Sequence, residues 1–245
     1  MCTLTYIPLS PKSYLFTSNR DEMKSRSTAF APSVHKKEGV SFLAPIDGQA
    51  LGTWLGANEH SRVVCLLNGA YTPHTPTPPY KHSRGKVVID ALLSENIDDY
   101  LLDYDFTNVE PFTLVIIENK INRKIHQFIW DGKIGTKNQL DPEQPHIWSS
   151  VTLYNSIQRE RRTHQFLNWL SSEQRSNHEI LEFHENLDKD IEQISGLSML
   201  RPQFCTVSTT QLLVDEQKVD MCYHDRISTE KDFASLSQKV LNHES

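Results

Sequence analysis

Cys2 is the residue of this chain whose type and position could by themselves support covalent chemistry. Removal of Met1, which is usual before a small side chain, would leave Cys2 with a free α-amine beside its thiol. The amine has an unperturbed pKa of about 7.7–8.0, so roughly one amine in seven is neutral at pH 7 and can accept the thiol proton. A terminal amine is a recognised base for activating a cysteine nucleophile. The alternative interpretation is a small buried residue on an edge strand.

The run Asn19-Arg20-Asp21-Glu22 is the second candidate for chemistry. A hairpin whose turn lies near residue 10 would place position 19 beside position 2. Four polar residues at a strand end are costly to bury unless they have partners. Asp21 could hold a terminal ammonium or orient the thiol, and Arg20 could bind a substrate carboxylate or pair with an acidic neighbour. A turn with solvated charges is the simpler alternative.

Asn68 is the third candidate. It follows Val63–Leu67, an apolar run typical of a buried strand, and a side-chain amide at the end of such a strand can donate to an oxyanion. Alternatively, Asn68-Gly69 is a common turn dipeptide. The candidate catalytic residues are therefore Cys2, Asp21 and Asn68, and the candidate substrate-binding residues are Asn19 and Arg20.

The histidines do not have the spacing of a metal site. His74 and His82 flank a proline-rich segment, and no pair of histidines has zinc-ligand spacing on a helix. The sequence also lacks a glycine-rich phosphate loop and a GxSxG motif. We therefore expect no metal and no cofactor.

Strands must position the candidate residues, and strand signals recur along the chain. Runs rich in β-branched and aromatic residues predict strands at Cys2–Ile7, Tyr14–Asn19, Gly52–Ala57, Arg62–Asn68, Phe112–Glu118, Lys124–Trp130, Phe204–Val207, Gln211–Val214 and Val219–Tyr223. The polar segment 23–40 is predicted to be a loop. Four prolines exclude a helix or central strand from 70–82, and we expect this long loop to border the site.

Helical signals fall in two blocks. Ser83 precedes Val87, Val88, Ala91 and Leu92 at helical spacing, and a second short helix should reach about Leu102. Residues 156–172 and 176–196 form the other block, with the apolar residues Ile157, Phe166, Leu167 and Leu170 predicted on one face. This order of elements fits one α+β domain over residues 1–245, with antiparallel sheets and helices packed outside them.

The composition excludes several classes of protein. The 245-residue chain is 38% hydrophobic and 23% charged with a net charge of −6, which argues against a disordered chain, a collagen-like repeat and a nucleic-acid binder. No apolar run approaches the roughly 18 residues of a spanning helix, and the start lacks the features of a signal peptide. The four cysteines lie far apart, as is typical of reduced thiols, so we expect a cytoplasmic location. No pattern indicates the oligomeric state.

Several motifs together resemble one known family. Met1-Cys2, Asn19-Arg20-Asp21-Glu22, Gly52-Thr53-Trp54-Leu55-Gly56, Leu67-Asn68 and Arg84-Gly85 follow the order and spacing of the NRDE family, the transport and Golgi organisation protein 2 homologues. The resemblance is clear over residues 1–93 and weaker through Trp148–Tyr154 and Phe204–Asp215. This family is similar to N-terminal nucleophile hydrolases of the bile-salt hydrolase and penicillin V acylase type.

The resemblance implies a four-layer αββα sandwich of two antiparallel sheets flanked by helices. It also implies that Cys2 is the nucleophile, that its own amine is the base, that Asp21 orients this amine and that Asn68 donates to the oxyanion. The sequence departs from the acylases at one point, because they carry an arginine just before the asparagine, where this chain has Ser18. On an alternating strand Arg20 would face away from Asn19 and Asp21.

Two functions are open from the sequence. The leading one is hydrolysis of an amide or related acyl bond in a small substrate. The alternative is a carrier or chaperone on the same fold that binds haem or an acyl lipid without turnover, and a purely structural protein is the third interpretation. The first two imply a small-molecule or lipid-like partner, such as haem, and no nucleic acid or membrane span.

Overall fold

The computed structural model describes residues 3–119, 122–171, 176–187 and 196–239. The strands are β1 (Thr3–Ser10), β2 (Ser13–Met23), β3 (Phe30–Lys37), β4 (Val40–Ile46), β5 (Leu55–Asn58), β6 (Arg62–Asn68), β7 (Phe112–Asn119), β8 (Arg123–Trp130), β9 (Gly135–Leu140), β10 (His146–Ser149), β11 (Phe204–Val214), β12 (Lys218–Asp225) and β13 (Lys231–Ser237). The helices are α1 (Arg84–Leu93), α2 (Ile97–Asp103), α3 (Ser156–Ser171) and α4 (Asn177–Glu185).

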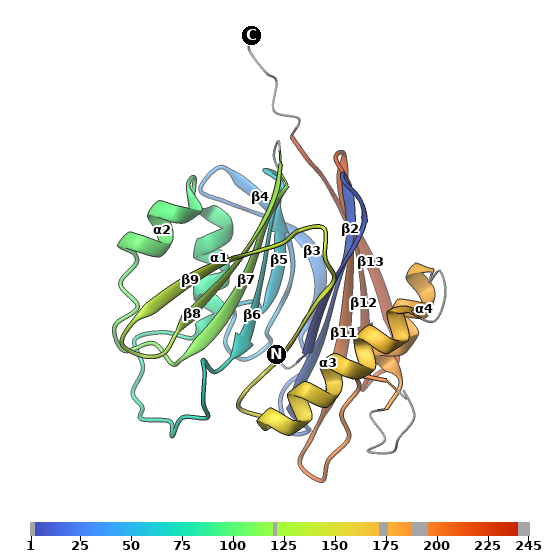
Figure 1. Cartoon of the computed structure of the whole chain (residues 1–245). Helices are drawn as coiled ribbons and strands as arrows, with labels where there is room; N and C mark the ends of the chain where they lie inside the picture. The colour runs from blue at the N-terminus through green and yellow to red at the C-terminus, as the bar shows by residue number, and fades with distance from the viewer. Residues whose placement is uncertain (1–2, 120–121, 172–175, 188–195, 240–245) are drawn as a thin grey trace.

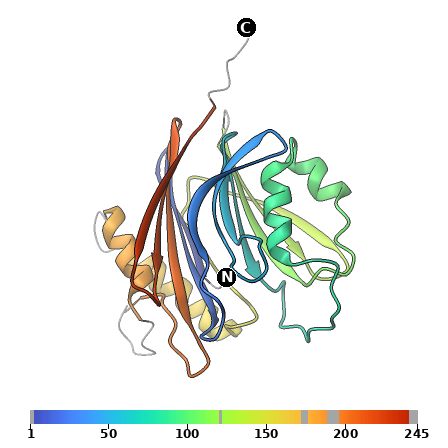
Figure 2. The same cartoon turned by 180° about the vertical axis from the view of Figure 1, so that it is seen from behind.

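Two antiparallel sheets pack face to face and carry helices on their outer faces (Figure 1). The six-stranded sheet has the order β10-β1-β2-β11-β12-β13, and the seven-stranded sheet runs from β3 to β9 in chain order. Helices α1 and α2 cover the seven-stranded sheet, and α3 and α4 cover the other sheet, as the view from behind also shows (Figure 2). The expected α+β sandwich with helices outside two antiparallel sheets is confirmed.

Strand alternation assigns the apolar side chains to separate layers. Leu4 and Tyr6 of β1 lie in the core between the sheets, whereas Ile7 packs with α3 and α4 on the outer side. A third cluster, which includes Val87 and Leu92, lies between α1, α2 and the seven-stranded sheet. Since each strand of the central layers is covered on both faces, little of β1, β2 or β6 reaches solvent.

The register of the six-stranded sheet determines what surrounds the start of β1. Thr3 pairs with Asn19 of β2 on one side and with Ser149 of β10 on the other. The β1–β2 hairpin turns at residues 11–12, close to the predicted position. Strand β1 therefore lies within the sheet, one short strand from its β10 edge.

The structure corrects the predicted loop at 23–40. Residues 30–37 form β3, which pairs with β4, although most of its side chains are exposed. It is an edge strand, so it lacks the apolar alternation by which buried strands are recognised. Strands β4, β9, β10 and β13 are not among the predicted strands.

Helices α1, α2 and α3 are close to the predicted ranges, but the predicted apolar face of α3 is only partly buried. In α3, Ile157 is 76% exposed and Leu167 is 45% exposed, whereas Arg162, Phe166 and Trp169 are buried. Helix α4 ends at Glu185, well before the predicted end at 196, and residues 188–195 lie outside the described part of the chain. Within the described residues, no helix is long and apolar enough to cross a bilayer.

Candidate functional site

The candidate site lies where β1 begins. Thr3 is fully buried between Asn19 and Ser149. The predicted nucleophile, Cys2, lies outside the described residues. The groups around Thr3, the first residue of β1, define the candidate site.

Residues 19–21 of β2 alternate between two sides of the six-stranded sheet. The side chains of Asn19 and Asp21 bond to groups of the helical side, including His184 and Tyr154. The Arg20 guanidinium lies between the sheets, 4.6 Å from the centroid of the Trp54 ring. The expectation that Arg20 faces away from its two neighbours is confirmed.

Asn19 is held by four contacts to protein groups. Its Nδ2 donates to the carbonyls of His184 and Leu197 at 2.9 and 3.0 Å, and its Oδ1 accepts from Thr209 Oγ1 at 3.1 Å. His184 Nδ1 lies 3.2 Å from the same Oδ1. The side chain therefore ties β2 to α4, and direct substrate binding by Asn19 would require one of these bonds to break.

His184 is a fully buried and neutral member of this network. Its Nε2 lies 2.7 Å from Thr5 Oγ1. Burial, and to a smaller extent the charge of Arg162, lower the pKa of His184 from 6.5 to about 3. The imidazole thus carries no proton charge at neutral pH and serves as a hydrogen-bonding bridge between β1 and β2.

Asp21 presents a buried carboxylate one residue beyond Arg20. Its Oδ1 accepts from Thr206 Oγ1 at 2.5 Å and its Oδ2 accepts from Tyr154 Oη at 3.1 Å. Thr206 Oγ1 in turn accepts from the Met199 backbone N–H at 2.7 Å. A carboxylate has about four acceptor positions, so several donors can share this buried group.

Arg162 of α3 brings a positive charge to the start of β1. It is fully buried, and its Nη2 donates to Thr3 Oγ1 at 2.7 Å and to the Leu197 carbonyl at 2.8 Å. The same guanidinium lies 4.3 Å from the centroid of the Tyr154 ring. The sequence did not predict this residue as part of the site.

Arg20 lines a pocket of about 230 Å³ between the sheets, which we call the arginine pocket. It is lined by residues of the separate sequence motifs, namely Arg20, Glu22, Gly52, Thr53, Trp54, Asn68, Arg84 and Gly85, together with Arg26, Asp47 and Glu110. The motifs that resemble one family are thus brought together in space although they span more than sixty positions of the chain. Asn68 and Arg20 share this pocket.

The arginines of this pocket are paired with carboxylates. Arg20 Nη2 donates to Asp47 Oδ2 at 2.5 Å, and Arg26 bonds both carboxylate oxygens of Asp47 at 3.0 and 3.1 Å. Burial alone would raise the pKa of Asp47, but bonds from Arg26 and the Ala50 backbone and the charge of Arg20 lower it to about 2. Arg84 pairs with Glu110 at 3.1 Å. The pocket is therefore rich in charge but internally neutralised.

Two glycines allow the two halves of the arginine pocket to meet. A Cβ on Gly52 would lie 2.7 Å from the carbonyl carbon of Gly85, and a Cβ on Gly85 would lie 3.1 Å from the backbone of Thr53. The Thr53 N–H donates to the Gly85 carbonyl at 3.3 Å. A Cβ at position 52 would force the backbone to shift, so Gly52 permits this contact, which places the first turn of α1 against the segment before β5.

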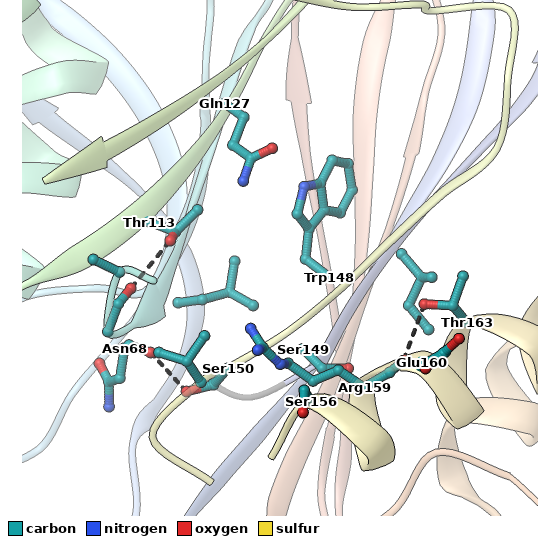
Figure 3. Close-up of a pocket in the computed structure, with 15 residues that line it drawn as sticks. Asn68, Thr113, Gln127, Trp148, Ser149, Ser150, Ser156, Arg159, Glu160 and Thr163 are labelled. Atoms are coloured by element: carbon teal, nitrogen blue, oxygen red, sulfur yellow. Dashed lines mark hydrogen bonds between the residues drawn. The ribbon is translucent and has the colours of Figure 1, made fainter. Parts of the chain in front are cut away.

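Asn68 lies between the arginine pocket and a second pocket. Ser150 Oγ donates to its carbonyl at 2.7 Å, so the end of β6 is joined to the segment that follows β10. Gly69 has φ +88°, and a Cβ there would lie 2.5 Å from the Val151 side chain. Figure 3 shows the Asn68 amide directed away from Trp148.

The second pocket, which we call the α3 pocket, measures about 300 Å³. Polar groups of the pocket come from β7, β8, β10 and α3 and include Thr113, Gln127, Ser149, Ser156 and Arg159 (Figure 3). Its apolar wall includes Leu67, Ile147 and Trp148. Because Ser149 is the partner of Thr3, this pocket lies beside the start of β1 on the side opposite to β2.

The proline-rich loop 70–82 borders the candidate site over part of its length. Ala70 lines the α3 pocket, but the later part of the 70–82 loop packs against residues 104–110, through Lys81–Asp105 at 2.7 Å and His82–Tyr104 at 3.0 Å. The loop therefore lines the α3 pocket at Ala70, and its His74 lies 3.4 Å from Glu110 of the arginine pocket. Over the described ranges of the chain, no three His, Cys, Asp or Glu side chains are grouped as a set of metal ligands.

Comparisons with known proteins agree with this architecture. The family model described as Transport and Golgi organisation 2 matches residues 1–230. Two variants of the conjugated bile acid hydrolase from Clostridium perfringens are similar in structure, with TM-scores of 0.58 and 0.59, sequence identities of 10% and 11%, and coverage of 100% of both chains. A Caenorhabditis elegans N-acylethanolamine-hydrolyzing acid amidase ortholog has a TM-score of 0.58 at 11% identity, covering 86% of this chain and 92% of its own. No curated protein matches the sequence significantly.

Proposed function

We propose that this chain, which belongs to the Transport and Golgi organisation 2 family, hydrolyses an amide or related acyl bond with Cys2 as the nucleophile. The fold is shared with a bile acid hydrolase and an acid amidase, and both names denote hydrolysis of such a bond. The observation that carries the proposal is the position of Thr3. Thr3 is buried between β2, which carries the Asp21 carboxylate, and β10, which leads to Ser150. The Ser150 hydroxyl donates to the Asn68 carbonyl. The α3 pocket includes Ser149 of β10, and the arginine pocket includes Arg20 of β2.

The proposed reaction has two stages. The neutral α-amine of Cys2 takes the thiol proton, the thiolate forms an S–C bond with the substrate carbonyl, and the carbonyl electrons move to oxygen. The ammonium then gives its proton to the leaving nitrogen as the C–N bond breaks. Water attacks the resulting thioester, releases the carboxylic acid and restores the thiol. Asn68 is proposed to donate its amide N–H to the oxyanion in both stages.

Two buried charges are suited to control the proton transfer. Asp21 carries a negative charge that would stabilise the protonated amine. Arg162 has the opposite effect, because a cation that bonds Thr3 favours a nearby thiolate and disfavours a nearby ammonium. We propose that the pair keeps the amine and thiol pKa values close, which is the condition for exchange of one proton between them.

The experiment is intact-mass analysis and turnover with three forms of the chain. The wild type should begin at Cys2 and gain one acetyl group there when treated with p-nitrophenyl acetate. Cys2→Ala should gain none. A chain with lysine inserted between Met1 and Cys2 keeps both Met1 and the thiol but lacks the adjacent amine, and it should lose most turnover of a panel of acyl amides.

The outcomes separate the proposed mechanism from a carrier. If the chain with the inserted lysine hydrolyses an amide at the wild-type rate, the terminal nucleophile is excluded. Retention of an acyl lipid or of haem, without a covalent adduct or turnover in the wild type, would favour the carrier function instead.

We also propose that the protein works in a reducing compartment such as the cytoplasm. Cys65, Cys205 and Cys222 are free thiols in the structure. A thiol nucleophile at Cys2 likewise requires reducing conditions, because oxidation would remove the reactive thiolate. Fractionation of cells that produce the tagged full chain tests this location.

A further inference from the structure

The α3 pocket contains an arginine that has no anionic partner. Figure 3 shows the Arg159 guanidinium directed into the pocket from α3, toward the side where Gln127 and Trp148 lie. Within the described part of the chain, no carboxylate forms an ion pair with Arg159, and its buried Nε has no hydrogen-bond partner. The carboxylate of the neighbouring Glu160 points away from this guanidinium (Figure 3).

The arginines that line the arginine pocket are paired with carboxylates. Arg20 bonds Asp47 at 2.5 Å and Arg84 bonds Glu110 at 3.1 Å. An arginine whose donors are partly removed from water gains free energy when an oxyanion accepts from them. The unpaired donors of Arg159 therefore identify the α3 pocket, rather than the arginine pocket, as the place for an anionic group.

The other walls of the pocket restrict the chemistry of the ligand. Thr113, Gln127 and Ser149 offer neutral hydrogen-bonding groups, and Leu67 and Trp148 offer apolar surface. The volume of about 300 Å³ is at the lower limit for small-molecule pockets. This combination suits a carboxylate attached to a short, partly apolar group rather than a long lipid chain.

We propose that the α3 pocket binds the carboxylate-bearing half of a small amide substrate, with Arg159 as the residue that determines specificity for the negative charge. The assignment of this ligand as a substrate rests on the hydrolase function proposed above. The location supports it, because the pocket includes Ser149, the partner of Thr3. A substrate held there would extend from the start of β1 toward α3.

Binding can be measured separately from turnover. Calorimetry with the Cys2→Ala chain would compare N-phenylacetylglycine with its primary amide, N-phenylacetylglycinamide, which differs only in the loss of the carboxylate charge. We expect the carboxylate to bind at least about tenfold more tightly. In the Cys2→Ala chain, Arg159→Gln should remove most of this preference and Arg159→Lys should keep part of it. Arg161→Gln is the matched control, because it removes the same charge from the same helix without lining the pocket, and it should leave the preference unchanged.

Each result decides between the two proposals. An unchanged preference after Arg159→Gln, equal binding of the two probes, or no binding of either probe would overturn the carboxylate site. If wild-type protein hydrolyses no amide but Arg159→Gln abolishes the preference, the hydrolase proposal fails and the carboxylate site stands. If the wild type and Arg159→Gln hydrolyse both amides with the same ratio of kcat/KM values, the hydrolase proposal stands and the assignment of Arg159 fails.

Discussion

Lowering the pH from 7.5 to 5.0 should destabilise the folded chain by about 2 kcal/mol through His184 alone. The ring is fully buried, and burial followed by the charge of Arg162 lowers its pKa from 6.5 to about 3. In the unfolded chain His184 takes up a proton as the pH falls through about 6.5, whereas the folded chain resists protonation until about 3. The unfolded state therefore binds more protons in this window, so stability from this group is complete above 6.5 and is lost as the pH falls.

The assay is urea unfolding at both pH values, followed by tryptophan fluorescence. In wild type, other groups also titrate, including carboxylates such as Asp47 and Glu59 whose pKa values are lowered to about 2. Their contribution cancels when the pH effect is compared between proteins. His184→Gln should lose about 2 kcal/mol less than wild type over this pH interval, whatever its stability at pH 7.5. His178→Gln, at an exposed position of the same helix, should respond like wild type. If His184→Gln and wild type differ by less than about 0.5 kcal/mol in this pH effect, the neutral buried imidazole and the network around Asn19 are refuted.

Two further predictions concern the space between and behind the sheets. Burial raises the pKa of Cys65 to about 12. Iodoacetamide at pH 8 should therefore label this thiol in guanidinium but not in the native chain, which peptide mass spectrometry would measure. Rapid labelling of the native chain would mean that the sheets separate. Gly52→Ala should reduce the free energy of unfolding by about 1–3 kcal/mol, because the new Cβ would lie 2.7 Å from the Gly85 carbonyl carbon. A variant as stable as wild type in urea would show that this contact is not close.

The sequence predicted antiparallel sheets with helices outside them because strands and helices have short-range patterns, whereas the sandwich was an implication of the family resemblance. Buried strands such as Arg62–Asn68 have apolar runs with clear ends, and alternation along β2 separates Arg20 from Asn19 and Asp21. What the sequence could not show was the partner of each polar group. Asp47, which neutralises Arg20, lies twenty-seven positions away with no periodicity that links the two.

Helix α3 shows how the search for apolar residues misled the prediction. Arg159, Arg162, Phe166 and Trp169 are spaced by three, four and three positions, so they share one helical face. This is the face directed at the sheet and the α3 pocket, since Arg162, Phe166 and Trp169 are buried and Arg159 lines the pocket. The prediction chose Ile157 and Leu167 because they are apolar, and thereby missed two cations of the candidate site. A periodicity analysis that admits arginine on a buried face would have found them.

The order of the strands has a consequence for how the protein is made. Strands β1 and β2 leave the ribosome first and can form a hairpin early, but β10, which covers Thr3, and β11, which supplies Thr206 to Asp21, come much later in the chain. At about 5–20 residues per second, translation from Asp21 to Thr206 takes roughly 10–40 s. During that time the start of β1 lacks the β10 neighbour that helps to bury Thr3 in the folded chain. The network around Thr3 and Asp21 is therefore completed only when synthesis has passed β11.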